Sequence, residues 1–150
     1  LLQNCEFMNC SAHSGGGLYS LNAESALENC LFQNCSALLS GGGLACYRLG
    51  PAIKTCRFMN CSSQKEGGGA YCAQSNPVIE NSVFQNCSTR YLYGGGMYCA
   101  QASPILKNCK FNTCSAMKDG GAIYCDGKSS PRVMYPLFTN NKPNNTNCVL

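Results

Sequence analysis

Apolar residues along the chain fall in short runs in which apolar and polar side chains alternate, and Asn, Gly and Pro separate these runs. Alternation is typical of β-strands, and the three separating residue types are typical of turns. No window keeps a period of about 3.6 residues long enough for a helix. The pattern therefore predicts an all-β chain of short strands joined by tight turns.

Two motifs recur at a nearly constant spacing. Gly-Gly-Gly begins at Gly15, Gly41, Gly67 and Gly94, and Gly-Gly-Ala begins at Gly120, so the steps are 26, 26, 27 and 26 residues. A block of the form Cys-x-Phe-x-Asn-Cys-Ser recurs with them, in an altered form in its fifth copy. A sixth copy is degenerate: it keeps an aliphatic residue and a Phe but has Pro136 and Asn141 at the cysteine positions.

A constant period of about 26 residues, with two or three short strands per repeat, lets each repeat pair in register with the next. The expected fold is a parallel β-helix (solenoid) of five full coils and a degenerate sixth, stacked about 4.8 Å apart. Leucine-rich repeats have a similar period, but their Leu-x-x-Leu-x-Leu signature is missing. We assign residues 1–141 to the solenoid and 142–150 to a polar C-terminal tail.

In such a fold, residues at equivalent positions of successive coils form a column along the rod. The expected core consists of one aromatic and one aliphatic column. The aromatic column is Phe7, Phe32, Phe58, Phe84, Phe111 and Phe138, and the aliphatic column is Leu2, Leu27, Ile53, Ile79, Leu106 and Val133. Simple alternation places the residue before each Phe outside, and it places Cys30 and Asn34 inside with Phe32, where stacked Asn amides would bond to one another.

The position after the aliphatic residue is expected to face outward. It reads Gln3, Glu28, Lys54, Glu80 and Lys107, so opposite charges alternate between stacked neighbours. Each such pair stabilises the correct register by about 0.2–1 kcal/mol. Random surface charge is the alternative interpretation.

Thirteen of the 14 cysteines fall into three columns. The first contains Cys5, Cys30, Cys56 and Cys109, with Ser82 in the fourth place. The second contains Cys10, Cys35, Cys61, Cys87 and Cys114. The third contains Cys46, Cys72, Cys99 and Cys125, after Ser20. Cys148 stands alone in the tail. Both buried thiol columns and a mixture with some disulfides remain open, because buried Cys packs well as a small apolar residue and neighbouring coils lie within disulfide range.

Zinc binding is a further alternative, because Cys-x4-Cys occurs four times. The intervening x-Phe-x-Asn is strand-like, however, and stacking would crowd thiolates about 5 Å apart. We therefore expect no metal and no cofactor.

Tyr19, Tyr71, Tyr98 and Tyr124 form a fourth column, interrupted at Ala45. Alternation places these side chains outside, beside the glycines. An exposed tyrosine stripe next to a bare glycine stripe would make a flat interaction surface. Alternatively, Gly-Gly-Gly only supplies backbone freedom at a tight corner.

Asn-x-Ser/Thr sequences occur at Asn9, Asn34, Asn60, Asn86 and Asn144. The first four share one column, where a glycan on every coil would clash and an inward Asn would be out of reach. Only Asn144 is expected to accept a glycan.

Composition narrows the range of functions. Charged residues make up 12% of the chain and the net charge is +4, without the basic face that nucleic-acid binding needs. No apolar run approaches the ~18 residues of a membrane span. Cysteine-rich chains are typical of secreted proteins, although disulfide scaffolds are usually shorter than this one. An extracellular or cell-surface location is therefore expected.

The Gly-Gly-Ala-Ile sequence from Gly120 to Ile123, its Gly-Gly-Gly variants and the Phe-x-Asn blocks resemble the polymorphic membrane protein repeat of chlamydial autotransporters and of some protist surface proteins. That repeat is described by Gly-Gly-Ala-(Ile/Leu/Val) and Phe-x-x-Asn, and the resemblance runs from Asn4 to Asn141. It implies a right-handed parallel β-helix at a cell surface, commonly an adhesin. Here Cys usually occupies the second Asn position, and only Phe138 to Asn141 keeps Phe-x-x-Asn.

The seven acidic residues do not cluster and His13 has no partner in its column, so catalysis is not expected. The favoured function is a structural or surface solenoid that stacks end-to-end on itself or on flanking coils of a longer chain, because the first coil lacks a polar cap. The alternative is an adhesin that binds a host protein or glycan. A polysaccharide-active β-helix enzyme is a more remote alternative.

Overall fold

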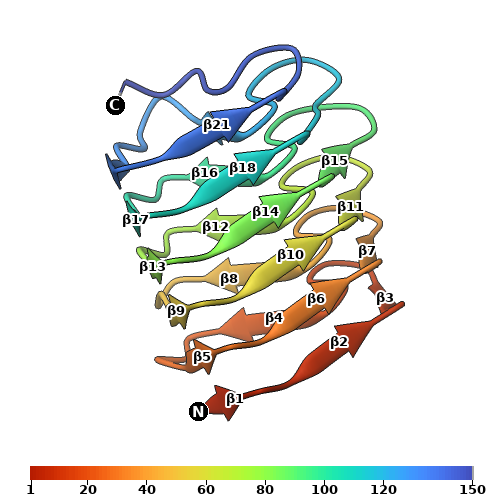
Figure 1. Cartoon of the computed structure of the whole chain (residues 1–150), viewed down its shortest axis with the longest axis vertical. Coiled ribbons are helices and arrows are strands. Elements are labelled where there is room, and N and C mark those ends of the chain that lie inside the picture. The colour runs from red at the N-terminus through yellow and green to blue at the C-terminus, as the bar shows by residue number, and fades with distance from the viewer. Residues whose placement is uncertain (150) are drawn as a thin grey trace.

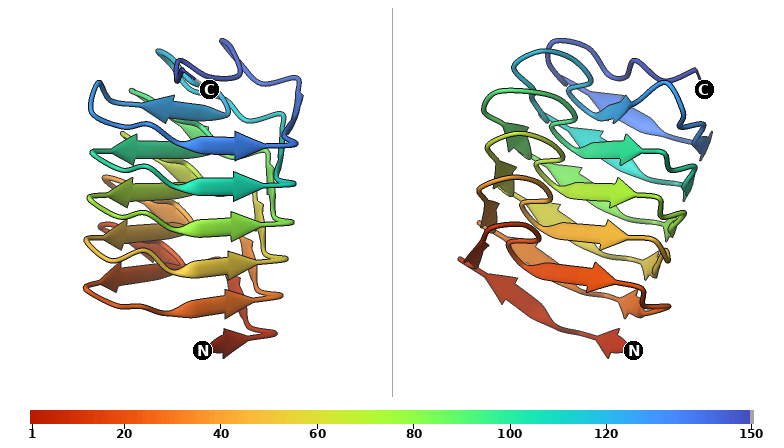
Figure 2. Two further views of the ribbon diagram at one scale, coloured as in Figure 1. Left: turned by 90° about the vertical axis from the view of Figure 1, so that its left-hand side faces the viewer. Right: turned by 180° about the vertical axis from the view of Figure 1, so that it is seen from behind.

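The computed structural model describes residues 1–149, and in that range the chain winds into a parallel β-helix (Figure 1). Four parallel sheets run along the rod, and successive coils stack with their strands side by side (Figure 2). We name the sheets A to D in the order in which one coil visits them. The β-helix of about 26 residues per coil is thus confirmed, with no helix among the described residues.

Sheets A and B have six strands each. Sheet A consists of β1 (Leu2–Gln3), β5 (Ala26–Glu28), β9 (Ala52–Lys54), β13 (Val78–Glu80), β17 (Ile105–Lys107) and β20 (Arg132–Met134). Sheet B consists of β2 (Glu6–Met8), β6 (Leu31–Gln33), β10 (Arg57–Met59), β14 (Val83–Gln85), β18 (Lys110–Asn112) and β21 (Leu137–Thr139).

Sheets C and D are smaller, with four and five strands. Sheet C consists of β3 (Ser11–Ala12), β7 (Ser36–Ala37), β11 (Ser62–Ser63) and β15 (Ser88–Thr89). Sheet D consists of β4 (Leu18–Leu21), β8 (Leu44–Tyr47), β12 (Ala70–Ala73), β16 (Met97–Ala100) and β19 (Ile123–Cys125).

The two expected core columns lie inside the rod. Phe32, Phe58, Phe84 and Phe111 have no exposed surface, and their rings stack nearly parallel with centroids 4.6–4.7 Å apart. The aliphatic column is buried beside them from Leu27 to Leu106. The last ring, Phe138, tilts by 33° at 5.7 Å from Phe111, so the stack loosens in the degenerate sixth coil.

The expectation that Asn34 points inward is wrong, because the strand ends before it. Asn34 has a φ of 55° and is exposed, and the equivalent residues of the other coils have the same left-handed backbone. Asn tolerates this conformation better than most residues, and it turns the chain so that Cys35, rather than Asn34, faces the core. The amides do form a ladder, but on the outside: Nδ2 of Asn34 donates to Oδ1 of Asn9 at 3.1 Å, and Nδ2 of Asn60 donates to Oδ1 of Asn34 at 3.2 Å.

The Gly-Gly-Gly corner is buried, so no bare glycine stripe exists on the surface. Gly41 has a φ of +67°. A Cβ on Gly42 would lie 2.3 Å from the carbonyl oxygens of Gly68 and Ser62, which belong to the next coil. A Cβ on Gly43 would lie 2.7 Å from the Phe58 ring. All three positions therefore require glycine for close packing of the corner, as the alternative interpretation predicted.

In sheet A, the column in which opposite charges alternate pairs in register, as expected. Lys54 is paired in register with both Glu28 and Glu80, and its Nζ lies 3.8 Å from the Glu80 carboxylate. Nε2 of Gln3 donates to Glu28 at 3.1 Å. These pairs are exposed, so each contributes at most about 1 kcal/mol.

The segment from Lys142 to Val149 lies on the fifth coil. The carbonyl of Asn145 accepts hydrogen bonds from the backbone N–H groups of Ala122 and Ile123, both at 3.0 Å. Oδ1 of Asn147 accepts from the N–H of Cys125 at 2.8 Å. Cys148, expected to stand alone, forms a disulfide with Cys125. We name residues 142–149 the strap.

Truncation of one central ring tests the importance of the phenylalanine stack. Phe58→Ala should lower the free energy of unfolding by about 3–5 kcal/mol, because it leaves a cavity between two fully buried rings. Arg57→Ala, one residue away on the exposed face, should change it by no more than about 0.5 kcal/mol. Urea denaturation followed by circular dichroism measures both values, and equal losses would contradict a core role for the ring.

Candidate functional site

The outer face of sheet D carries the tyrosine column predicted from the sequence. Tyr19 is 49% exposed, and Tyr71, Tyr98 and Tyr124 are half-buried. Their register is direct, since Tyr71 pairs with Tyr98 and Tyr98 with Tyr124 on neighbouring strands. Ring centroids are 5.5 Å apart in the first pair and 5.1 Å in the second, with interplanar angles of 16° and 19°.

The interruption at Ala45 is filled by a residue that sequence reasoning missed. Tyr47 follows Ala45 by two positions and so projects from the same face of β8. Its ring lies 5.2 Å from that of Tyr19 and 5.6 Å from that of Tyr71, which are the register neighbours of Ala45. Ala45 itself is fully buried. The aromatic row is thus continuous over five coils.

A sixth tyrosine joins the row from the loop before Gly94. The ring of Tyr93 stacks on that of Tyr124 with centroids 4.3 Å apart, and Lys118 Nζ lies 5.5 Å from its centroid. Tyr93 takes the position directly before the glycine corner, which Ser40, Glu66 and Asp119 occupy in other coils, so this position shows no aromatic pattern in the sequence. We call Tyr19, Tyr47, Tyr71, Tyr93, Tyr98 and Tyr124 the tyrosine ladder.

Close packing changes the acidity of these phenols. Burial, followed by the negative charge of Glu66, raises the pKa of Tyr98 to about 12 and raises that of Tyr71 further. Burial and the neighbouring Tyr93 raise the pKa of Tyr124. The phenols of these three residues therefore stay protonated and neutral at physiological pH.

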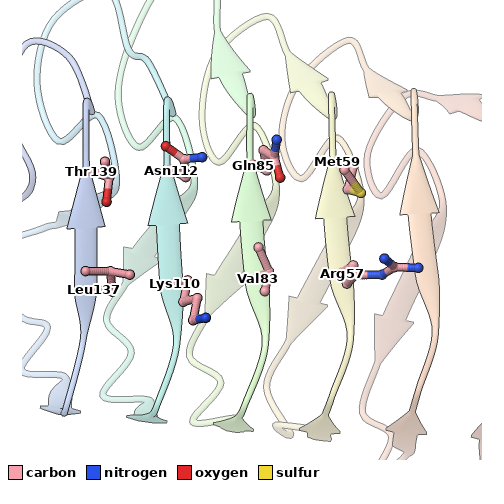
Figure 3. A pocket seen from close by; sticks show the side chains of 8 residues that line it. All are labelled: Arg57, Met59, Val83, Gln85, Lys110, Asn112, Leu137 and Thr139. Atoms are coloured by element: carbon pink, nitrogen blue, oxygen red, sulfur yellow. The ribbon is translucent and has the colours of Figure 1, made fainter.

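A shallow groove lies on the outer face of sheet B. Its volume is about 370 Å³ and two rows of side chains border it, as Figure 3 shows. One row is Arg57, Val83, Lys110 and Leu137, and the other is Met59, Gln85, Asn112 and Thr139. The lining has two cations and no carboxylate, so the groove has no acid–base pair of its own.

The cysteines line the interior in the three columns expected. Twelve thiols are free among residues 1–149, and ten of them are buried. In the second column each thiol from Cys35 to Cys114 donates to a carbonyl of the coil below, as from Cys61 to Phe32 at 3.4 Å and from Cys87 to Phe58 at 3.3 Å. In the sixth coil Nδ2 of Asn141 makes the same bond to Phe111 at 2.9 Å, so Asn replaces the thiol as a donor.

Burial makes several of these thiols weaker acids by raising their pKa. It raises the pKa of Cys35 and Cys56 to about 11 and that of Cys99 to about 12. Contact with the Cys87 thiol instead lowers the pKa of Cys61. Within residues 1–149, no group of three or more His, Cys, Asp or Glu side chains is placed to hold a metal ion.

Comparison with known proteins assigns the fold to a family. A family model described as a right-handed β-helix region matches residues 1–149. The chain belongs to the right-handed β-helix family. Comparisons with curated proteins and with solved structures return no match. Right-handed β-helix regions occur in enzymes and in proteins without catalytic activity, so the family alone does not assign a function.

Two further residues considered in the sequence, His13 and Asn144, do not belong to the ladder. His13 is exposed in the loop before the first glycine corner. Asn144 is exposed in the strap, where its Nδ2 donates to Asp119 at 2.6 Å and its Oδ1 accepts from Gly120 N–H at 2.9 Å. Glycosylation of Asn144 stays a prediction. Within residues 1–149, no helix has the length and apolar character of a membrane span.

Thiol accessibility tests the cysteine columns. With an aromatic disulfide reagent at mildly alkaline pH, only the half-buried Cys5 and Cys10 should react quickly in the native β-helix. The buried thiols should react only after unfolding, because the reagent cannot reach them in the native state. Thiols are counted by absorbance with and without guanidinium. A total below the twelve expected after unfolding would show additional disulfides in the columns.

Alkaline titration tests the ladder. In the unfolded chain tyrosines ionise near pH 10, about two units below Tyr98 in the fold. Above that pH the unfolded state binds fewer protons than the folded state, so stability should be complete below about pH 10 and fall as the pH rises toward 12. Urea denaturation across this range measures the loss. Tyr98→Phe should reduce the slope, whereas Tyr135→Phe, at a 78% exposed site, should leave it unchanged.

Proposed function

We propose that this β-helix is a non-catalytic structural segment of an extracellular or cell-surface protein. The observation that carries the proposal is the regularity of its columns. From the second to the fifth coil the same side-chain types occupy most core positions, and each coil packs against its neighbours along these columns. Active sites usually break such local rules, because catalytic groups must be held in unusual environments.

The distribution of ionisable groups supports a non-catalytic role. Glu66 is a carboxylic acid near the ladder whose pKa is raised by burial. None of the main pockets found among residues 1–149 is lined by two carboxyl groups. Glycoside hydrolysis by the common mechanisms requires two facing carboxyl groups. This makes the polysaccharide-active alternative the least supported.

The disulfide between Cys125 and Cys148 supports the proposed location. Such bonds persist mainly in oxidising compartments outside the cytosol. The motif resemblance to polymorphic membrane protein repeats points the same way. The surrounding buried thiols are compatible with this location, because reagents do not reach them easily.

The proposed partner of the first coil is another β-helical coil. Strands β1, β2 and β4 each have one neighbour in their sheet, and Leu2, Phe7 and Leu18 are only partly buried. A flanking coil of a longer polypeptide, or a second copy of this chain, would cover these side chains and pair the open strand edges.

Adhesion is the second candidate function, and the tyrosine ladder favours it. Tyrosine is enriched at protein interfaces, because it combines a large apolar surface with a polar hydroxyl group. A continuous row of six tyrosines on one face offers such a surface to a host protein or glycan.

Sedimentation velocity tests the assembly of the 150-residue chain. Its sedimentation coefficient should rise with protein concentration, because uncovered coil edges pair. Phe7→Asp should suppress this rise by placing a charge on the open edge, and Leu38→Asp, on a 53% exposed side loop, should not. Each variant is first checked for cooperative unfolding. A wild-type chain that stays monomeric at every concentration would contradict self-assembly.

A further inference from the structure

The tyrosine ladder is an unusual grouping of oxidisable side chains. Six of the eight tyrosines of the chain belong to it, and each ring lies within 5.6 Å, centroid to centroid, of at least one other. The two remaining tyrosines, Tyr91 and Tyr135, lie outside the ladder and are 49% and 78% exposed. The most exposed tyrosine, Tyr135, therefore lies outside the ladder, although Tyr19 within it is as exposed as Tyr91.

We propose that the ladder is a site of oxidative phenol coupling, and that Tyr93 and Tyr124 are the preferred pair. Their centroids are 4.3 Å apart at an angle of 26°, the shortest aromatic separation in the described part of the chain. Tyr93 lies directly before Gly94, outside the named strands but bridged in parallel register to Glu66 and Asp119, whereas the other ladder tyrosines lie on sheet D. Because Tyr93 and Tyr124 are not register partners, their separation is not set by the spacing of adjacent strands, and it is shorter than the 5.1 Å between the register partners Tyr98 and Tyr124.

The reaction needs a one-electron oxidant, which a haem peroxidase with hydrogen peroxide provides. Each phenol loses one electron and one proton and becomes a phenoxyl radical, with unpaired spin on the ring carbons ortho to oxygen. Two radicals form an ortho–ortho carbon–carbon bond, and each ring then transfers its ortho hydrogen to its own oxygen. One peroxide molecule accepts the two electrons and two protons and leaves as two water molecules. The product is a dityrosine that is two hydrogen atoms lighter.

The surroundings of the pair favour coupling within one molecule. The partner ring is already in place, so the local concentration of the second phenol far exceeds that of any other molecule in dilute solution. The Tyr124 phenol is protonated at physiological pH, so its oxidation removes a proton together with the electron. The ring of Tyr124 is partly exposed, so its phenol can be oxidised from solution.

A dityrosine bond between Tyr93 and Tyr124 would link two successive coils. Tyr93 precedes the fourth glycine corner, and Tyr124 lies on β19 of the following coil, next to Cys125. The Cys125–Cys148 disulfide joins that coil to the strap. A dityrosine between residues 93 and 124 would extend this covalent connection, so that two successive coils and the strap could no longer separate. Such a bond would form whether or not the β-helix has the function proposed for it.

Treatment of the dilute 150-residue chain with a haem peroxidase and hydrogen peroxide tests the proposal. We expect dityrosine fluorescence, a monomer on denaturing gels, and a cross-linked proteolytic fragment that joins Tyr93 to Tyr124 and lacks two hydrogen atoms. Oxidation of the exposed Met117 adds oxygen instead, so mass spectrometry separates the two products.

Phenylalanine variants provide matched controls, because they keep the ring and remove the phenol. Tyr93→Phe and Tyr124→Phe should each lower the intramolecular dityrosine yield about tenfold, since the best-placed pair is lost. Tyr91→Phe and Tyr135→Phe should leave it unchanged. Equal cooperative unfolding of the variants confirms that the fold is intact. Undiminished yield in Tyr93→Phe, dimers linked through Tyr91 or Tyr135 as the main product, or no coupling in the wild type would each overturn the proposal.

Discussion

In-register stacking of identical positions is the constraint on which the rest of this β-helix depends. Because each residue lies against its equivalents in the neighbouring coils, a side chain must be compatible with copies of itself about 4.8 Å away. Phe satisfies this condition by parallel ring stacking, and Asn satisfies it by amide-to-amide hydrogen bonds. Cys satisfies it as a small apolar side chain whose thiol bonds to a carbonyl of the coil below. Charges satisfy it only when their signs alternate, as in the column that contains Lys54 and Glu80.

The same constraint explains why so much of the fold is predictable from the sequence. The repeat period, the two core columns and the outward direction of the tyrosines all follow from spacing and alternation. The columns also tolerate some substitutions. Ser82 takes a cysteine position and is fully buried, and its hydroxyl group donates to the Glu80 carbonyl at 2.9 Å. A column can therefore lose one thiol without losing its hydrogen bond, as Asn141 also illustrates.

The features that the sequence did not reveal lie where the chain departs from a regular strand. Alternation predicted an inward Asn34, but alternation holds only within a strand, and a left-handed residue at the corner reverses the direction of the side chains after it. Tyr47 was missed because it is displaced by two residues from its column and leans back over Ala45. Tyr93 was missed because its position, directly before each glycine corner, is occupied by Ser40, Glu66 and Asp119 in other coils and shows no aromatic pattern. Cys148 was missed because the strap has no period, so only the three-dimensional path of the backbone brings it to Cys125.

The external amide ladders have a direction, and this gives the rod an electrical polarity. From Asn29 to Asn4, from Asn86 to Asn60 and from Asn108 to Asn81, Nδ2 donates toward the N-terminal coil, so the amide dipoles add in one sense as peptide dipoles do in a helix. The formal charges are distributed in the opposite sense to these dipoles, whose positive ends point toward the N-terminal coils, and whole charges outweigh the partial charges of amides. The first 47 residues contain three acidic and no basic residues, whereas the rest contain four acidic and 11 basic residues. An approaching ion or protein thus meets a negative field near the first coils and a positive field near the last, and this difference orients the rod before contact.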